Sequence, residues 1–149
     1  MRLLLITILA GFISTMSFAD GHTTPGAGYG TAITVGSKKI EGTSGVLVHQ
    51  TTNDLWIWEN PLKGFPKATS ATCDQFFAFA SGQQQPIGGS FTCQSVDGDG
   101  DGLISTGAFQ QDGTALITQI AGTGKWAQHV GKQFIGKTDI QADVSTSVY

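Results

Sequence analysis

Short segments of alternating polar and apolar residues, separated by turn-forming residues, constrain this chain most strongly. They recur at near-regular spacing between Thr31 and Val144, with Gly, Pro, Asn and Asp gathered between them. No stretch shows the sustained three- or four-residue apolar spacing that an amphipathic helix requires. Only 13% of the residues are charged, whereas glycines number 21. We therefore expect an all-β protein, because this pattern is typical of sandwiches and barrels of short strands.

The expected strands are separated by recognisable turns. Residues 52–54 (Thr-Asn-Asp) have the composition of a hairpin turn, and residues 36–39 and 112–113 also predict turns. One short helical turn is expected around Lys125–Val130. The expected strands span residues 31–35, 45–50, 55–58, 73–80, 89–96, 103–110 and 114–121, with one or two more within 134–144.

The N-terminus has the three-part anatomy of a secretory signal peptide. Arg2 gives a positive start, residues 3–13 are mostly apolar, and Ser17 and Ala19 are the small residues of a cleavage site. The apolar run is shorter than the roughly 20 residues that span a bilayer, which disfavours the alternative of a membrane anchor. We predict a signal peptide over 1–19, a flexible leader over 20–30 and a single β-domain over 31–149. The mature chain would be exported, periplasmic or extracellular, with no integral membrane segment.

The charge balance excludes some partners. Arg2 lies in the predicted signal peptide, so the mature chain has lysine as its only strongly basic residue, and the net charge of the whole chain is −3. Nucleic-acid binding needs clustered Lys and Arg to neutralise phosphates, and no such cluster exists here. The same argument disfavours an anionic membrane surface.

The two cysteines, Cys73 and Cys93, both follow the predicted signal peptide. Export to an oxidising compartment favours a disulfide between them. If their strands pair in register, the two residues would face each other across neighbouring strands, which suits disulfide geometry. A redox or metal-binding pair is the alternative, but CxxC spacing and an adjacent histidine are both missing.

An acidic run of alternating Asp and Gly, residues 97–102, is open to two interpretations. Asp97, Asp99 and Asp101 match the first three ligand positions of an EF-hand calcium loop. The twelfth position, which should be Glu, is Ala108, so a true EF-hand is not expected. The run then forms either a solvated hairpin turn or a weak Ca²⁺ site. No other cofactor is expected.

Aromatic residues alternate along two of the expected strands. Trp56 and Trp58 share one face of their strand, and Phe77 and Phe79 share one face of theirs. Such a set forms either a pocket for a flat or fatty ligand or ordinary core packing. Leu55 lies on the opposite face of its strand from the tryptophans, so a subunit interface and a homo-oligomer are also considered.

Residues 122–126 (GTGKW) resemble the GTGKY/F-type turn of the bacterial secreted relatives of allene oxide cyclase and dirigent proteins. Residues 130–136 resemble the closing strand of that family, and residues 96–101 its acidic hairpin. The resemblance implies an eight-stranded antiparallel barrel, allene-oxide-cyclase-like or calycin-like, with an apolar cavity; a β-sandwich is the alternative. Trp126 is expected to fold back onto one end of the barrel, and it joins the candidate ligand-binding residues.

Three functional hypotheses follow. We favour a non-enzymatic exported barrel that binds a small apolar ligand or a protein partner in a site of Trp56, Trp58, Phe77, Phe79 and Trp126. The first alternative is a cyclase- or dirigent-type isomerase that steers a reactive intermediate within the barrel. The second is a structural or adhesive protein that binds Ca²⁺ weakly. No arrangement of nucleophile and base is recognisable in the sequence, so no catalytic residue is assigned.

Overall fold

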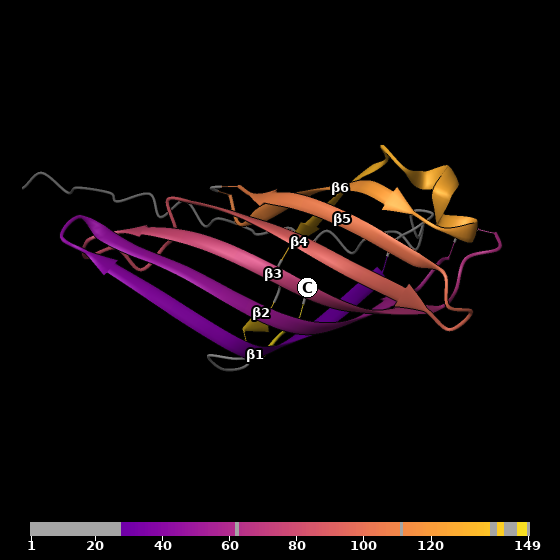
Figure 1. The fold of residues 1–149 in the computed structure, drawn as a ribbon, viewed down its shortest axis with the longest axis horizontal. Coiled ribbons are helices and arrows are strands. Elements are labelled where there is room, and N and C mark those ends of the chain that lie inside the picture. The colour runs from indigo at the N-terminus through magenta and orange to yellow at the C-terminus, as the bar shows by residue number, and fades with distance from the viewer. Residues whose placement is uncertain (1–27, 62, 111, 138–139, 142–145, 149) are drawn as a thin grey trace, which may run out of the picture.

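The computed structural model describes residues 28–61, 63–110, 112–137, 140–141 and 146–148 (Figure 1). Nine strands within these ranges form one antiparallel sheet, which confirms the all-β prediction. The sheet order is β7-β6-β5-β4-β3-β2-β1-β9-β8. The elements are β1 (Gly28–Gly42), β2 (Gly45–Trp58), β3 (Ala68–Ala80), β4 (Gly88–Asp97), β5 (Gly102–Phe109), β6 (Thr114–Gly122), the 3₁₀ helix η1 (Gly124–His129), β7 (Gln133–Lys137), β8 (Ile140–Gln141) and β9 (Thr146–Val148).

The first two strands are longer than the sequence pattern predicts. The predicted turn at 52–54 is wrong, because β2 continues through it and buries Thr52 and Asp54 on its inner face. The predicted turn at 36–39 is also wrong: β1 continues there and has a register shift between Thr34 and Gly36. The last three residues of the predicted leader, 28–30, belong to β1. The rest of the leader and the predicted signal peptide lie outside the described residues.

One face of the sheet carries the core. Buried and exposed residues alternate along β3 to β6, as expected for strands with one covered face. The central buried cluster comprises Ala71, Cys73, Phe91, Cys93, Ala115 and Ile117. Cys73 and Cys93 are direct cross-strand partners and form a disulfide, as the sequence predicts, with their Cα atoms 4.0 Å apart. We call this covered side the inner face.

The two ends of the sheet are joined by a very short piece of chain. β7 and β8 are the first and last strands of the sheet, yet Lys137 ends β7 and Ile140 begins β8. Three residue steps span at most about 11 Å even when extended. The sheet must therefore curl strongly to bring its edges together, and Figure 1 shows the twisted and curved course of β1 to β6. No hydrogen-bonded ladder joins β7 to β8 among the described residues.

Candidate functional site

A cavity of about 240 Å³ lies on the inner face of the sheet. It is reached by strands from both halves of the chain, since residues of β2 through β7 contribute to it together with the start of β1. The residues that line it are Gly28, Trp56, Ile57, Trp58, Thr69, Ser95, Leu103, Ser105, Ile117, Gln119, Phe134, Ile135 and Gly136. Two of the predicted ligand-binding residues, Trp56 and Trp58, are thus brought together here.

Aromatic rings form the walls of this inner cavity. The rings of Trp56 and Trp58 lie 6.5 Å apart between centroids and are inclined by only 19°. Phe134 on β7 approaches Trp58 from the other end of the sheet, at 6.4 Å. Rings at these separations make favourable aromatic contacts, so this part of the wall is apolar.

The sequence analysis missed Gln119 and Phe134. Gln119 is only 2% exposed and faces inward from β6, in the same register as the buried apolar residues Ala115 and Ile117. Its signal in the sequence was a polar residue at the position where the alternation of Ala115 and Ile117 predicts a third buried apolar one. Phe134 could not be found in this way, because its place in the cavity depends on the curl that brings β7 across to β2.

Two buried polar atoms in the cavity wall lack hydrogen-bond partners among the described residues. They are the indole N–H nitrogen of Trp58, Nε1, and the side-chain carbonyl oxygen of Gln119, Oε1. Three hydroxyl side chains also line the cavity, from Thr69, Ser95 and Ser105. Buried polar groups in folded proteins nearly always have a partner, so each exception needs an explanation.

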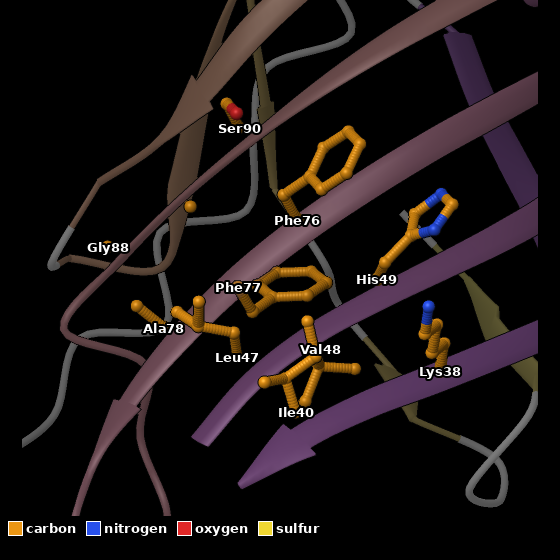
Figure 2. A pocket seen from close by; sticks show the side chains of 11 residues that line it. Lys38, Ile40, Leu47, Val48, His49, Phe76, Phe77, Ala78, Gly88 and Ser90 are labelled. Atoms are coloured by element: carbon orange, nitrogen blue, oxygen red, sulfur yellow. The ribbon is translucent and has the colours of Figure 1, made fainter. Parts of the chain in front are cut away.

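Phe77 and Phe79 belong to a different aromatic group. Phe77 packs against Phe109 at 4.7 Å and against Phe79 at 6.3 Å between ring centroids. Phe77 lines a second hollow of about 570 Å³ that spans β1 to β4 near the β1–β2 hairpin (Figure 2). Phe79 lines neither hollow. The five predicted ligand-binding residues therefore do not form one site.

The larger hollow opens on the outer side of the sheet. Phe76 and Leu47, which line it, are 50% and 56% exposed. His49 stacks on Phe76 and its Nε2 lies 3.0 Å from Asp74 Oδ1, as Figure 2 shows for the two rings. Hydrogen bonds from His49 and Thr51 hold the pKa of Asp74 below its usual range. We place the candidate site in the smaller inner cavity, which is more enclosed and is walled by three aromatic rings.

The acidic run and the GTGKW segment pack against each other at the end of the sheet. Lys125 Nζ lies 2.8 Å from Asp97 Oδ2, 2.6 Å from Asp99 Oδ2 and 3.4 Å from Asp101 Oδ2. The Lys125 backbone N–H also donates to Asp101 Oδ2 at 3.3 Å. We call these four residues the Asp–Lys clasp. A Cβ atom at Gly124, whose φ is +47°, would overlap the Asp101 carboxylate, so glycine is required there.

Asp97 is the centre of the clasp. Its Oδ1 accepts the backbone N–H groups of Asp99 and Asp101 at 2.9 and 3.1 Å, and its Oδ2 accepts the indole N–H of Trp126 at 3.0 Å. Burial opposes the negative charge, but the hydrogen bonds from Lys125 and these N–H groups outweigh it and lower the pKa of Asp97 to about 2. The hydrogen bonds from Lys125 to Asp97, Asp99 and Asp101 raise the pKa of the lysine, and the bond to Asp97 has the largest effect.

Trp126 closes the end of the sheet and does not line the inner cavity. It is 1% exposed and meets Phe65 edge-on at 4.6 Å, and Phe65 meets His129 at 4.3 Å. Burial, together with the charge of Lys132, lowers the pKa of His129. The helical turn expected around Lys125–Val130 is confirmed as η1.

The predicted Ca²⁺ ligands are thus close together, with a lysine ammonium among them. In the part of the chain that the structure describes, no group of three or more His, Cys, Asp or Glu side chains has a geometry suited to a metal ion. Calcium binding at Asp97, Asp99 and Asp101 stays a prediction, and any ion would have to compete with Lys125 for the same oxygens.

The fold and cavity together define a curled antiparallel sheet protein with an aromatic-walled internal hollow. Comparison of the chain with family models, with curated proteins and with solved structures finds no match. Membership of the allene oxide cyclase and dirigent group therefore stays a prediction from the sequence motifs. Within the described ranges, no helix is long and apolar enough to cross a membrane.

Proposed function

We propose that this protein binds one small, flat and mostly apolar molecule in the inner cavity. The observation that supports this most directly is the hollow of about 240 Å³ walled by Trp56, Trp58 and Phe134. Since each water takes up about 30 Å³ in the liquid, the space equals that of roughly eight waters. That volume suits a ligand of one or two fused rings, and apolar concave pockets with a few polar groups are typical binding sites.

The proposal includes closure of the sheet into a barrel. The two-residue connection between Lys137 and Ile140 supports closure, because it holds both ends of the sheet within about 11 Å of each other. Phe134 against Trp58 supports it further, since these rings belong to β7 and β2. A closed sheet would bury its edges and enclose the cavity from all sides.

Naphthalene tests the proposal, because it is flat, apolar and small enough for the cavity. Isothermal titration calorimetry should show one site in the native protein. Trp56→Ala should weaken binding about tenfold or more, because an aromatic wall and its buried area are lost. Phe76→Ala is the matched control, since it removes an aromatic residue from the outer face and should leave the affinity unchanged. Absence of binding to the native protein, or equal loss in both variants, would exclude the inner cavity as the site.

A second candidate, isomerase activity of the cyclase type, is supported by one feature of the inner face. Asp54 is buried there, 6% exposed, and its Oδ2 lies 3.4 Å from Cys73 Sγ. This is a packing contact, since a disulfide sulfur has no proton to donate. A buried carboxylate beside an apolar cavity is a common position for acid–base chemistry. The purified protein should then change the stereoisomer ratio of a cyclising allene oxide, and Asp54→Asn should restore the ratio found in buffer alone.

Export and self-association are further proposals. The disulfide and the lack of a membrane-spanning helix among the described residues are compatible with an exported protein. Leu55 on the outer side of β2 is 45% exposed, which supports association of copies over that face. Light scattering during size-exclusion chromatography measures this directly, and a monomer at high concentration would contradict it.

A further inference from the structure

The distal half of β1 is a strand edge that the described sheet leaves without a partner. β1 pairs with β2 along its whole length but with β9 only at Thr31, Ala32 and Ile33. Among the described residues, no strand therefore pairs with the other edge of residues 37–42, which lead into the β1–β2 hairpin at one end of the molecule (Figure 1). An edge of this kind presents a row of N–H and C=O groups to which a further strand can bind.

We infer that a second copy of this chain supplies that strand. Two copies would pair antiparallel, edge to edge, about a two-fold axis at Ile40, so that the sheet continues from one copy into the other. A two-fold interface is built from the same patch on both copies, and the patch must therefore be complementary to itself. This contact lies at a strand edge, whereas the self-association proposed above lies over the outer face around Leu55.

The charges of residues 37–42 (SKKIEG) fit this arrangement. With the axis at Ile40, Lys39 lies directly opposite Glu41 of the second copy, and the symmetry repeats this pair with the copies exchanged. Opposite charges in direct cross-strand positions stabilise the pairing of strands, and like charges destabilise it. Lysines on an edge strand usually keep other strands away. Here Glu41 gives each Lys39 a partner of opposite charge instead.

The same charges exclude the neighbouring registers. An axis moved by one residue would place Lys39 opposite Lys39, or Glu41 opposite Glu41. Lys38 causes no conflict, because the axis at Ile40 places it opposite Gly42, which has no side chain. The edge therefore specifies one register, as a specific contact between strands requires.

Apolar side chains on the outer face continue across the same junction. Ile40 is paired with Leu47 on β2, and Leu47 is paired with Ala78 on β3. Ile40 and Leu47 are both exposed in the single copy. In the dimer Ile40 would lie beside Ile40 of the second copy, so the row extends through both. The Cβ atoms of direct cross-strand neighbours are about 4.5–5.5 Å apart, close enough for the two isoleucines to shield each other from water.

Sedimentation velocity of the native protein, with its disulfide intact, tests the dimer. A short edge buries little surface, so we expect a dissociation constant in the micromolar range. Glu41→Lys places lysines opposite Lys39 and should weaken the dimer about tenfold. Lys39→Glu should do the same, because glutamates then face Glu41. Lys38→Glu is the matched control, since it makes the same change in charge opposite Gly42 and should alter the affinity less than about twofold.

Recombination of the charges makes the test specific. The double variant Lys39→Glu/Glu41→Lys restores opposite charges in every pair and should dimerise as the native protein does. An equimolar mixture of the Lys39→Glu and Glu41→Lys proteins should form a mixed dimer although each dimerises poorly alone, which also shows that both variants are folded. Ile40→Cys should form a disulfide between copies under mild oxidation, whereas Lys38→Cys should not, because only residue 40 meets itself at the axis.

The possible results separate this inference from the other proposals. A monomeric native protein, or a dimer that Glu41→Lys and Lys38→Glu affect equally, would overturn it. A dimer that Leu55→Asp abolishes and Glu41→Lys leaves intact would support association over the outer face and contradict the edge contact. Ligand binding in the inner cavity is independent of these results, because none of residues 37–42 lines that cavity.

Discussion

At the scale of single residues, Asp97 shows how one side chain joins three parts of the chain. Its two oxygens accept from the acidic run's own backbone, from Lys125 and from Trp126. The side chain has no exposed surface, so the charge is maintained entirely by these donors. Asp97 therefore links the β4–β5 turn to η1 and fixes the tryptophan that covers the end of the sheet.

Asp97 should make the free energy of unfolding depend on pH in the acidic range. Its folded pKa of about 2 lies below the unfolded value of about 3.9, so the contribution is complete above about pH 5 and is lost as pH falls through 2. The difference corresponds to about 2 kcal/mol. Asp97→Asn should lower the free energy of unfolding by roughly this amount at pH 7 and flatten its decline between pH 5 and 2, as measured by urea denaturation.

Asp99→Asn is the matched control for this prediction. The Asp99 side chain is 76% exposed, and exposed ion pairs contribute little. Its substitution should leave both the stability at pH 7 and the acid profile close to those of the native protein. Equal effects of the two substitutions would show that Asp97 has no special role.

Residue types predicted the alternation of the strands well but not the polar residues of the inner face. Thr52, Asp54 and Gln119 are buried, and polar residues of this kind are normally found in turns or on surfaces. The predicted turn at 52–54 failed for this reason. Local sequence cannot show that an inward polar side chain will meet a partner from a strand far away in the chain.

At the scale of elements, the Asp–Lys clasp explains two motifs that the sequence presents separately. The acidic run and the GTGKW segment form one unit, in which Gly102 N–H donates to Thr123 Oγ1 at 2.7 Å and Thr123 N–H donates to the Gly102 carbonyl at 2.8 Å. Of the two interpretations of the acidic run, the solvated hairpin turn did not include a partner for the carboxylates, whereas Lys125 contacts all three. No pattern in the sequence indicated that these segments would pair.

The clasp leads to a prediction about calcium. In the native protein the Lys125 ammonium occupies the oxygens of all three carboxylates, so millimolar Ca²⁺ should shift the melting temperature little. Lys125→Met should lower the melting temperature by several degrees, because a buried carboxylate loses its ion pair. Ca²⁺ should then restore part of the loss, as measured by calorimetry with and without chelator. A Lys125→Met protein that does not respond to Ca²⁺ would rule out the acidic run as a metal site.

The disulfide ties β3 to β4 at the centre of the core. Cys73 and Cys93 are 1% and 3% exposed, so a reductant cannot reach them in the folded protein. We expect the native protein to resist dithiothreitol at neutral pH and to be reduced only when denaturant is added, as followed by thiol alkylation and mass spectrometry. Cys73→Ala/Cys93→Ala should lower the free energy of unfolding by about 3 kcal/mol, the value for a loop of this length. Rapid reduction without denaturant would contradict the burial.

At the scale of the whole molecule, the short connection from β7 to β8 determines the shape. The sequence predicted the number and direction of most strands, but the lengths of β1 and β2 and the curl depend on long-range pairing. The resemblance to a barrel family predicted closure, whereas the described strands show a curled sheet whose edges are joined by covalent connection. A closed barrel would need a hydrogen-bonded ladder between β7 and β8, which are the two end strands of the described sheet.

Truncation after Lys137 tests the role of this end of the chain. Removal of β8 and β9 would leave β1 without its strand partner at Thr31–Ile33. It would also remove the short connection from β7 that keeps the two ends of the sheet close together. We expect loss of naphthalene binding and association through the exposed strand, seen by calorimetry and by size-exclusion chromatography. Removal of Tyr149 alone breaks no described strand pair and serves as the control. A monomeric truncated protein that still binds would show that the curl does not need these strands.

The pairing of Thr31 with Val148 has a consequence for the order of the chain itself. Because the first and last strands lie next to each other, a linker of a few residues could connect Val148 to Gly28. New ends could then be opened in the turn between β3 and β4, at Ser81–Ile87, without breaking any strand pair. The order in which the strands follow one another along the chain could therefore begin at β4 as well as at β1, and a circularly permuted gene should encode the same sheet.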